Sequence, residues 1–244
     1  MKLRNSLFTI VTAAGFLAGS VGVLHAQDDA AAKDKTAEAK AKAPKDKKKA
    51  GKAKTNAAKF VSLFDGKSLN GWKANEENPS SFSIEDGAIK VNGERGHLFY
   101  VGDVNGGKFK NFVLKAKVMT KKNANSGLYF HTAYQKEGWP DKGYEVQVNN
   151  THSDWRKTGS LYAVDDVKEA QKDDTWMNYT VRVQGNHVTI RVNGKKVVDY
   201  TQPEKPAHLE QMPGRLISEG TFAIQAHDPG STAYFKDIQV RVLD

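Results

Sequence analysis

Residues 143–150 (GYEVQVNN) place a carboxylate and two amides at alternate positions, Glu145, Gln147 and Asn149. Because successive side chains of a β-strand point to opposite faces, these three polar groups share one face of the expected strand. A positioned carboxylate can abstract a proton, and amides exchange hydrogen bonds with sugar hydroxyls. This face is therefore a candidate site for chemistry on a carbohydrate.

A second segment, 125–131 (NSGLYFH), alternates in the same way, and its polar face carries Asn125, Gly127, Tyr129 and His131. A glycine inside a strand weakens the strand and usually marks a bulge or the close approach of another group. Such a glycine suits a position that faces a ligand. An amide, a phenol and an imidazole thus join the candidate site.

A third segment, 222–228 (FAIQAHD), directs Gln225 and His227 away from its apolar positions, and two loops offer the aromatic side chains Tyr162 and Trp155. Carboxylates, amides, imidazoles and aromatic rings together are typical of a sugar site. Taken one at a time, each of these side chains is more often solvated or structural. The interpretation therefore depends on the three strands lying side by side in one sheet.

The rest of 60–244 supplies further short alternating runs separated by turn residues, such as FVLKAKVM. Asn193 and Gly194 lie between two such runs, and this pair tolerates the positive φ of a type I′ hairpin. No long segment has a clean period of 3.6, which disfavours folds with crossover helices. We expect an all-β domain, an antiparallel two-sheet sandwich, with at most a helical turn within 165–175.

The N-terminal residues differ from this domain in composition. Lys2 and Arg4 precede an apolar run that ends in small residues, which predicts a secretory signal peptide over 1–26. Residues 27–59 contain 11 Lys, five acidic residues and 11 Ala, which predicts a disordered Lys/Ala-rich linker. The apolar run is short for a membrane span, so we expect a periplasmic or secreted protein without a transmembrane segment after signal cleavage. The sequence has no Cys, which excludes thiol catalysis and disulfides.

The formal net charge of +9 lies mostly outside the domain, because 1–26 carries +2, 27–59 carries +6 and 60–244 retains only +1. A basic chain can bind nucleic acid, but charge confined to the tail of an exported protein does not predict that partner. A weak contact of the linker with an anionic envelope surface stays open. A solvated spacer is the favoured interpretation.

Signals for metals and cofactors are weak. The sequence contains no H-x-x-x-H pair, EF-hand loop, G-x-S-x-G elbow or Gly-rich phosphate loop. We therefore predict neither a metal centre nor a cofactor, while an oxygen-rich Ca²⁺ site in the loop 151–166 stays open.

Seven segments follow one another along 60–244: LFDGKSLNGWK, SFSIEDGAIKV, NSGLYFH, GYEVQVNN, GSLYAV, WMNYTVRVQGNHVTIRVNGKKV and GTFAIQAHD…AYFKDIQVRVL. In this order they resemble the 3-keto-disaccharide hydrolase family, formerly a domain of unknown function. The resemblance implies a concanavalin- or laminin-G-like jelly roll, frequent export, and a substrate already oxidised to a ketone at C3 of a glucosyl unit. One position departs from the family, because the residue after NSGLYF is often Arg there and is His131 here.

A ketone at C3 acidifies the proton on C2, so a base can form an enolate and the aglycone at C1 can leave by β-elimination. Water then adds to the unsaturated sugar. This route needs one base, an enolate stabiliser and a proton donor, and it does not need the carboxylate pair of an ordinary glycosidase. The predicted catalytic residues are Glu145 or His131 as the base, with His227 or Gln147 to polarise the C3 oxygen or donate a proton. The predicted substrate-binding residues are Gln147, Asn149, Tyr129, Tyr162, Trp155, Gln225 and Asn125.

Three other functions fit the same residues. The first is a non-catalytic carbohydrate-binding module, since jelly rolls host lectins as readily as enzymes. The second is a structural or adhesive envelope protein, in which the linker would be the working part. The third is an ordinary hydrolase of unoxidised glycans that uses Glu145 with a loop acid such as Asp154 or Asp228.

Overall fold

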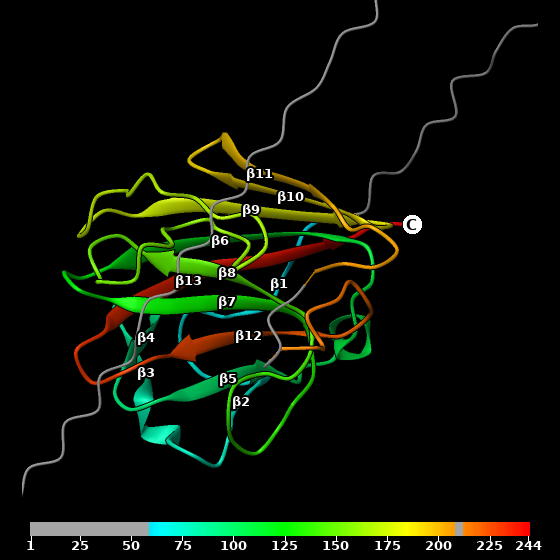
Figure 1. Ribbon diagram of the computed structural model, residues 1–244. Helices are drawn as coiled ribbons and strands as arrows, with labels where there is room; N and C mark the ends of the chain where they lie inside the picture. Colours follow the sequence, from blue (N-terminus) through cyan, green and yellow to red (C-terminus); the bar gives the residue numbers. More distant parts are fainter. Residues whose placement is uncertain (1–58, 208–211) are drawn as a thin grey trace, which may run out of the picture. The chain divides into compact units, whose positions relative to one another are not determined.

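The computed structural model describes residues 59–207 and 212–244, so the expected signal peptide and nearly all of the expected linker lie outside the described residues. Within those residues, two antiparallel sheets of eight and five strands form a sandwich, and helical structure is confined to two short 3₁₀ turns (Figure 1). None of the residues in these two ranges belongs to a helix long and apolar enough to cross a membrane. The prediction of an all-β two-sheet sandwich is confirmed.

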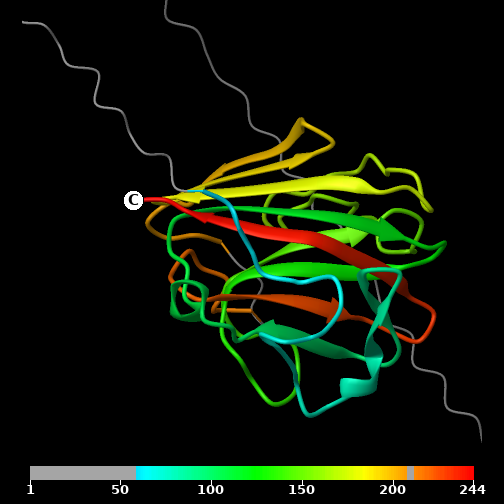
Figure 2. The ribbon, with the colours of Figure 1, turned by 180° about the vertical axis from the view of Figure 1, so that it is seen from behind.

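The larger sheet has the strand order β11-β10-β9-β6-β13-β4-β3, and the short β1 pairs with β13. Figure 2 shows three of its neighbours, yellow β9, green β6 and red β13, side by side. The strands of this sheet are β1 Val61–Ser62, β3 Phe82–Glu85, β4 Ala88–Asn92, β6 Phe112–Thr120, β9 Met177–Gln184, β10 His187–Val192, β11 Lys195–Thr201 and β13 Thr232–Val242.

The smaller sheet has the order β2-β5-β12-β7-β8, so β7 and β8, which are consecutive in sequence, lie beside a strand from near the C-terminus. Its strands are β2 Trp72–Ala74, β5 Gly96–Tyr100, β7 Asn125–Thr132, β8 Tyr144–Asn149 and β12 Thr221–Ala226, and the 3₁₀ turns are η1 Pro79–Ser81 and η2 Val104–Gly107.

Tight turns join several of the antiparallel pairs. Asn193 and Gly194 between β10 and β11 have φ values of 50° and 83°, as the sequence predicts for a type I′ turn. Asp86 and Gly87 between β3 and β4 adopt the same left-handed region, with φ values of 48° and 73°. These turns fix the registers that set which side chains share a face.

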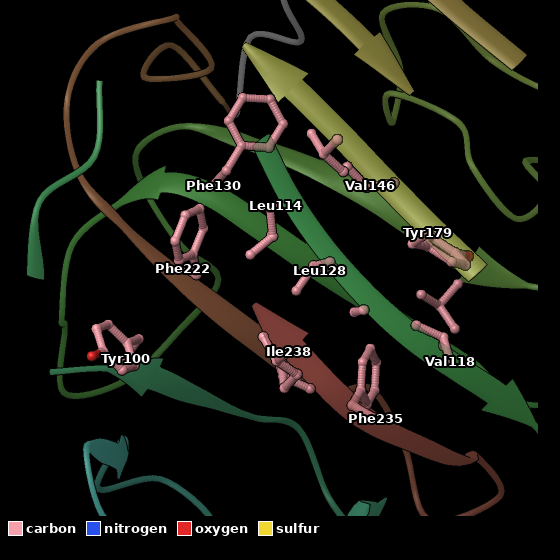
Figure 3. Close-up of a cluster of buried hydrophobic side chains, with 14 of the residues drawn as sticks. Tyr100, Leu114, Val118, Leu128, Phe130, Val146, Tyr179, Phe222, Phe235 and Ile238 are labelled. Atoms are coloured by element: carbon pink, nitrogen blue, oxygen red, sulfur yellow. The ribbon is translucent and has the colours of Figure 1, made fainter. Parts of the chain in front are cut away.

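The core lies between the two sheets and is built from the apolar positions of the alternating runs (Figure 3). The larger sheet contributes side chains such as Leu114, Val118 and Tyr179, and the smaller sheet contributes Leu128 and Phe130. All five are nearly inaccessible to solvent. The inner faces are therefore fully occupied by packing, which leaves the outer faces for function.

The two outer faces differ in exposure. Strands β6 and β9 alternate between buried and accessible residues, whereas every residue of β7, β8 and β12 is buried. In β8 the polar positions are therefore buried as fully as the apolar ones. The helical turn that the sequence allows within 165–175 does not form, since this segment is a loop whose Val167 carbonyl accepts the Lys157 N–H at 2.8 Å.

Candidate active site

The polar side chains of three strands meet on the outer face of the smaller sheet. Tyr129 of β7 lies opposite Glu145 of β8, and Gly127 lies opposite Gln147. On the other side of β7, β12 contributes Gln225. The hydrogen bonds described next join these strands directly, so the separate polar faces expected from the sequence form one surface.

Glu145 is the centre of a buried hydrogen-bond network, and only 4% of its surface is accessible. The Tyr129 hydroxyl donates to Glu145 Oε2 at 3.0 Å, and Arg215 Nη2 lies 3.3 Å from the same oxygen. Gln225 Nε2 donates to the Tyr129 hydroxyl at 2.9 Å and lies 3.4 Å from Glu145 Oε1. The carboxylate therefore faces three donors in a site that excludes bulk water.

Burial sets the protonation behaviour of this network. Loss of solvent around the Glu145 carboxylate raises its pKa above the ordinary value, and the opposing effects of Arg215 and of the Tyr129 hydrogen bond are smaller. Burial also raises the pKa of Tyr129 well above its usual range, so its hydroxyl stays protonated and donates. A buried carboxylate with a raised pKa is suited to accept a proton near neutral pH.

Gly127 explains how the carboxylate fits against the sheet. A Cβ at this position would lie 2.5 Å from Glu145 Oε1 and 2.9 Å from its Cγ, which is far inside normal contact distance. The Glu145 side chain thus lies directly over the glycine backbone. The group whose close approach the sequence predicts at Gly127 is the carboxylate itself.

A cavity of about 90 Å³ opens beside this carboxylate. Asn125 and Gln225 line it, and each has a buried amide oxygen without a hydrogen-bond partner among the described residues. Unsatisfied buried acceptors are costly, and they suit a ligand that brings hydroxyl donors. The other lining residues are Tyr129, Trp139, Glu145, Gln147, Asp154, Tyr162, Met212 and His227.

Trp139 forms an aromatic wall of the cavity. Its ring centroid lies 5.6 Å from the ring of His97 and 5.6 Å from that of His227, and Arg95 lies over it at 5.4 Å. The Trp139 side chain is partly exposed, at 38%. An aromatic face held between two imidazoles at a cavity edge suits stacking against a sugar ring.

His227 is fixed by an acidic neighbour. Its Nδ1 lies 2.8 Å from Asp228 Oδ2, and the same carboxylate oxygen accepts the Ser231 hydroxyl at 2.8 Å. With Nδ1 donating to Asp228, Nε2 is the nitrogen left to exchange a proton with a bound ligand. The pair can orient His227 for proton exchange at the cavity.

Three side chains in this region lie close enough to be tested as metal ligands, His152, His227 and Asp228, whose ligand atoms lie within 4.8 Å of one another. However, His152 Nδ1 accepts the Asp154 N–H at 3.1 Å, and His227 Nδ1 is bonded to Asp228. A cation bound through His152 Nδ1 would have to replace its hydrogen bond with Asp154, whereas His227 Nε2 could hold a cation while Nδ1 still donates to Asp228. The hydrogen bond at His152 therefore opposes a metal centre here, and the one at His227 does not.

His131 lies outside the cavity lining, contrary to the alternation expected from the sequence. It is the unpaired residue at the register shift between β7 and β12, between Phe130 and Thr132, and its φ of 58° turns its ring out of the alternation. Its Nε2 donates to the Lys110 carbonyl at 2.9 Å and its Nδ1 accepts the Ser218 N–H at 3.2 Å. The ring packs edge-on against Phe112, so both nitrogens are occupied in a structural role.

Two further expected residues do not line the cavity. Asn149 shares the expected face, but its Nδ2 donates to the carbonyls of Asp154 and Arg156 at 2.9 and 2.8 Å, so its amide holds a loop. Trp155 is 50% exposed and packs against Arg156 and Lys168. Strand alternation predicts which polar side chains share a face. It does not predict which of them are already hydrogen-bonded to the loops that cover that face.

Arg215 is a candidate site residue that sequence reasoning missed, because it lies in a loop with no periodic pattern. Gly214 beside it approaches the chain at Gly143, whose N–H donates to the Gly214 carbonyl at 2.9 Å. Arg215 also donates to the Tyr162 carbonyl at 3.3 Å, and its guanidinium lies 5.1 Å from the Tyr162 ring. The site therefore contains a buried cation, although His131 stands where an arginine was expected.

Comparisons with known proteins identify relatives of this chain. A curated 3-keto-disaccharide hydrolase of Bacteroides thetaiotaomicron is 29% identical over 78% of this chain and 80% of its own length. A crystal structure of a Parabacteroides distasonis protein, provisionally assigned as a glycosyl hydrolase, is 25% identical with a TM-score of 0.65, covering 76% of this chain and 94% of that one. The carbohydrate-binding module CBM66 of Bacillus subtilis, at 12% identity and a TM-score of 0.50 over 70% of this chain and 95% of its own, shares the fold alone.

The family model of the 3-keto-alpha-glucoside-1,2-lyase-like domain matches residues 59–241, which is most of the chain and all of the sandwich except the last residue of β13. Its span includes the carboxylate, the donors around it and the loops that line the cavity. The chain therefore belongs to the 3-keto-alpha-glucoside-1,2-lyase-like family.

Proposed function

We propose that this protein cleaves the glycosidic bond of 3-keto-glucosides by abstraction of the C2 proton and β-elimination, followed by hydration. The observation that carries the proposal is the buried Glu145 carboxylate, whose pKa is raised and which faces hydrogen-bond donors beside a cavity. Family membership and the name of the Bacteroides relative support a 3-keto sugar as the substrate.

In the first step the C2–H bond breaks, the proton passes to Glu145, and the electron pair forms an enolate whose charge lies on the C3 oxygen. Arg215 and the Tyr129 hydroxyl are the nearest donors to the Glu145 carboxylate and supply positive potential to this region. Preorganised donors of this kind stabilise developing charge at little reorganisation cost. The base and the stabilising cation thus belong to one network.

In the second step the C3 carbonyl re-forms, a C1=C2 double bond appears, and the C1–O bond to the aglycone breaks. The departing oxygen requires a proton, and His227, oriented by Asp228, is the proposed donor, with Gln147 as a further polarising group. Addition of water places hydroxide on C1 and a proton on C2, which gives the free 3-keto sugar. Elimination followed by the addition of water amounts to hydrolysis of the glycosidic bond.

Sugar binding is assigned to side chains that line the cavity and keep polar atoms without partners. Asn125 and Gln225 offer acceptors to hydroxyls, and Tyr162 and Trp139 offer aromatic faces. A non-catalytic binding module would gain nothing from burying a carboxylate, which costs free energy unless it is used or fully paired. The buried Glu145 therefore favours an enzyme over a binding module.

The decisive experiment offers the purified protein a 3-keto-glucoside and its unoxidised parent side by side. We expect cleavage of the ketone only, with C2 deuterium incorporated from D₂O. Glu145→Gln should lower kcat by about 10²–10⁴-fold, the usual value of a general base. Asp154→Asn is the matched control, because the Asp154 carboxylate already accepts the Arg156 N–H at 2.9 Å. Cleavage of the parent glycoside that depends on both acids would instead indicate an ordinary hydrolase.

We also propose that the enzyme works in the periplasm or outside the cell, on the strength of the sequence of 1–26. N-terminal sequencing of the protein recovered from the periplasmic or culture fraction should begin at Gln27. Recovery of intact Met1 from the cytoplasmic fraction would contradict the proposal.

A further inference from the structure

The outer face of the larger sheet carries a second surface, on the other side of the sandwich from the cavity. A groove of about 340 Å³ there is lined by four cationic side chains, together with Phe60, and by uncharged residues. The four cations, which we call the basic groove, are Lys115, Arg182, Arg191 and Arg241.

Strand register places these cations in two rows across the sheet. In one row, Arg241 of β13 and Arg182 of β9 lie on either side of Val113. In the other, Lys115 of β6 and Arg191 of β10 lie on either side of Thr180. Because neighbouring strands are about 4.8 Å apart, the two cations of each row are separated by about 10 Å.

The basic groove has no acidic residue in its lining, and none of its cations forms an ion pair within the described ranges. Other cations on the same face do have carboxylate partners. The pairs are Lys90 with Glu85, Lys117 with Asp237, Lys121 with Asp174 and Lys196 with Asp199. The four groove cations thus lack the direct carboxylate partners that these four lysines have.

Two contacts hold the groove in place. The Phe60 ring lies between Lys115 and Arg241, at 4.3 Å from the ammonium nitrogen and 4.9 Å from the guanidinium carbon. Arg241 Nε is buried and has no hydrogen-bond partner among the described residues. Since residues 60–244 carry a formal charge of only +1, this clustering is local and does not follow from a basic domain.

We propose that the basic groove binds an extended acidic polysaccharide of the polyuronate type, in which every sugar ring carries a carboxylate and every second carboxylate can meet a cation of the groove. Guanidinium groups match carboxylates with paired hydrogen bonds, and threonines between the cations can bind hydroxyls. A repeat of about 10 Å across the rows suits charges two sugar rings apart. Because the groove and the cavity lie on opposite outer faces, a chain bound at the groove leaves the cavity free.

The test measures binding of the full-length protein to polygalacturonate by affinity electrophoresis, with neutral dextran as the reference polymer. The double variant Arg182→Gln/Arg191→Gln is compared with Lys117→Gln/Lys196→Gln, which removes two paired cations from the same face. We expect the groove variant to bind polygalacturonate at least about fivefold more weakly, as two exposed charge contacts predict, and the control to change by less than about twofold. Thermal unfolding should be unchanged in both.

The proposal would be overturned if both double variants lost the same amount of binding to polygalacturonate. It would also be overturned if the wild-type protein bound polygalacturonate no more tightly than dextran. The same comparison with duplex DNA distinguishes the chemistry of the ligand. If DNA binding weakened in the groove variant as much as polygalacturonate binding, the surface would be a general polyanion site and the polysaccharide assignment would be wrong.

Discussion

Replacement of Gly127 by alanine tests the geometry of the candidate active site without removing a functional group. The new Cβ would lie 2.5 Å from Glu145 Oε1, 2.9 Å from Cγ and 3.0 Å from Cδ. Carbon atoms in contact prefer about 3.5–4.0 Å, so the carboxylate must move by about 1 Å. A misplacement of this size costs about 10²-fold in rate, and we expect that loss to appear mainly in kcat.

The effect on stability should be small by comparison. Alanine reduces the conformational freedom of the unfolded chain, which favours folding by about 0.5–1 kcal/mol, and the displaced side chain opposes this by about 1–3 kcal/mol. Gly96→Ala is the matched control, since Gly96 is also a strand glycine, its φ is not positive, and its nearest neighbour would lie 3.3 Å away. Kinetics on a 3-keto-glucoside and thermal unfolding of both variants check the two expectations.

The double variant Gly127→Ala/Glu145→Gln makes the test specific. If alanine acts only by displacing the carboxylate, its effect should vanish once that carboxylate is replaced, and the two losses will not add. Wild-type kcat in Gly127→Ala, or fully additive losses in the double variant, would refute the assignment of Glu145 as a positioned base.

Four further predictions follow from the same geometry. The base works ionised and its pKa is raised, so kcat/KM should fall as the pH drops through a value above the ordinary glutamate range, and a limb near 4.3 would contradict this. Arg215→Met removes a charge that lowers that pKa, so the acid limb should move to higher pH and kcat should fall by about 10²-fold, with Arg215→Lys retaining more activity. His131→Asn should lower the free energy of unfolding by about 1–3 kcal/mol in denaturant titrations while kcat/KM is unchanged, and lost activity at full stability would return His131 to the mechanism. EDTA should leave kcat unchanged, because the proposed base and donors are side chains. A loss of activity in EDTA that added Mn²⁺ or Ca²⁺ restores would contradict this prediction.

The fold follows from sequence because the alternating runs and turn pairs are local signals. Positive φ at Asn193–Gly194 and the antiparallel pairing on either side of it require no knowledge of distant residues. The segment 165–175 misleads because its helix-favouring composition lacks an apolar stripe, and contacts with the 157–161 segment hold it as a loop. Tertiary contacts decided that local question.

The candidate site is predictable to the extent that it is built on strands. Glu145, Tyr129 and Gln225 come together because their strands are neighbours and alternate without interruption between them. His131 fails the same rule, because a bulge adds a residue that no periodicity predicts. Arg215 lies in a loop, where its position depends on contacts far along the chain.

The residues in and around the cavity come from two kinds of backbone, the strands and the connections between strands. Glu145 and Tyr129 belong to paired strands, whereas Trp139, Tyr162 and Arg215 belong to connections between strands. Exchange of the connections that carry Trp139 and Tyr162 would alter the contacts with the leaving group, while the strand that carries Glu145 and its partner Arg215 are kept. To change the aglycone that the protein accepts, one would randomise the connections that carry Trp139 and Tyr162 and leave the strands that carry Glu145 and Tyr129 unchanged.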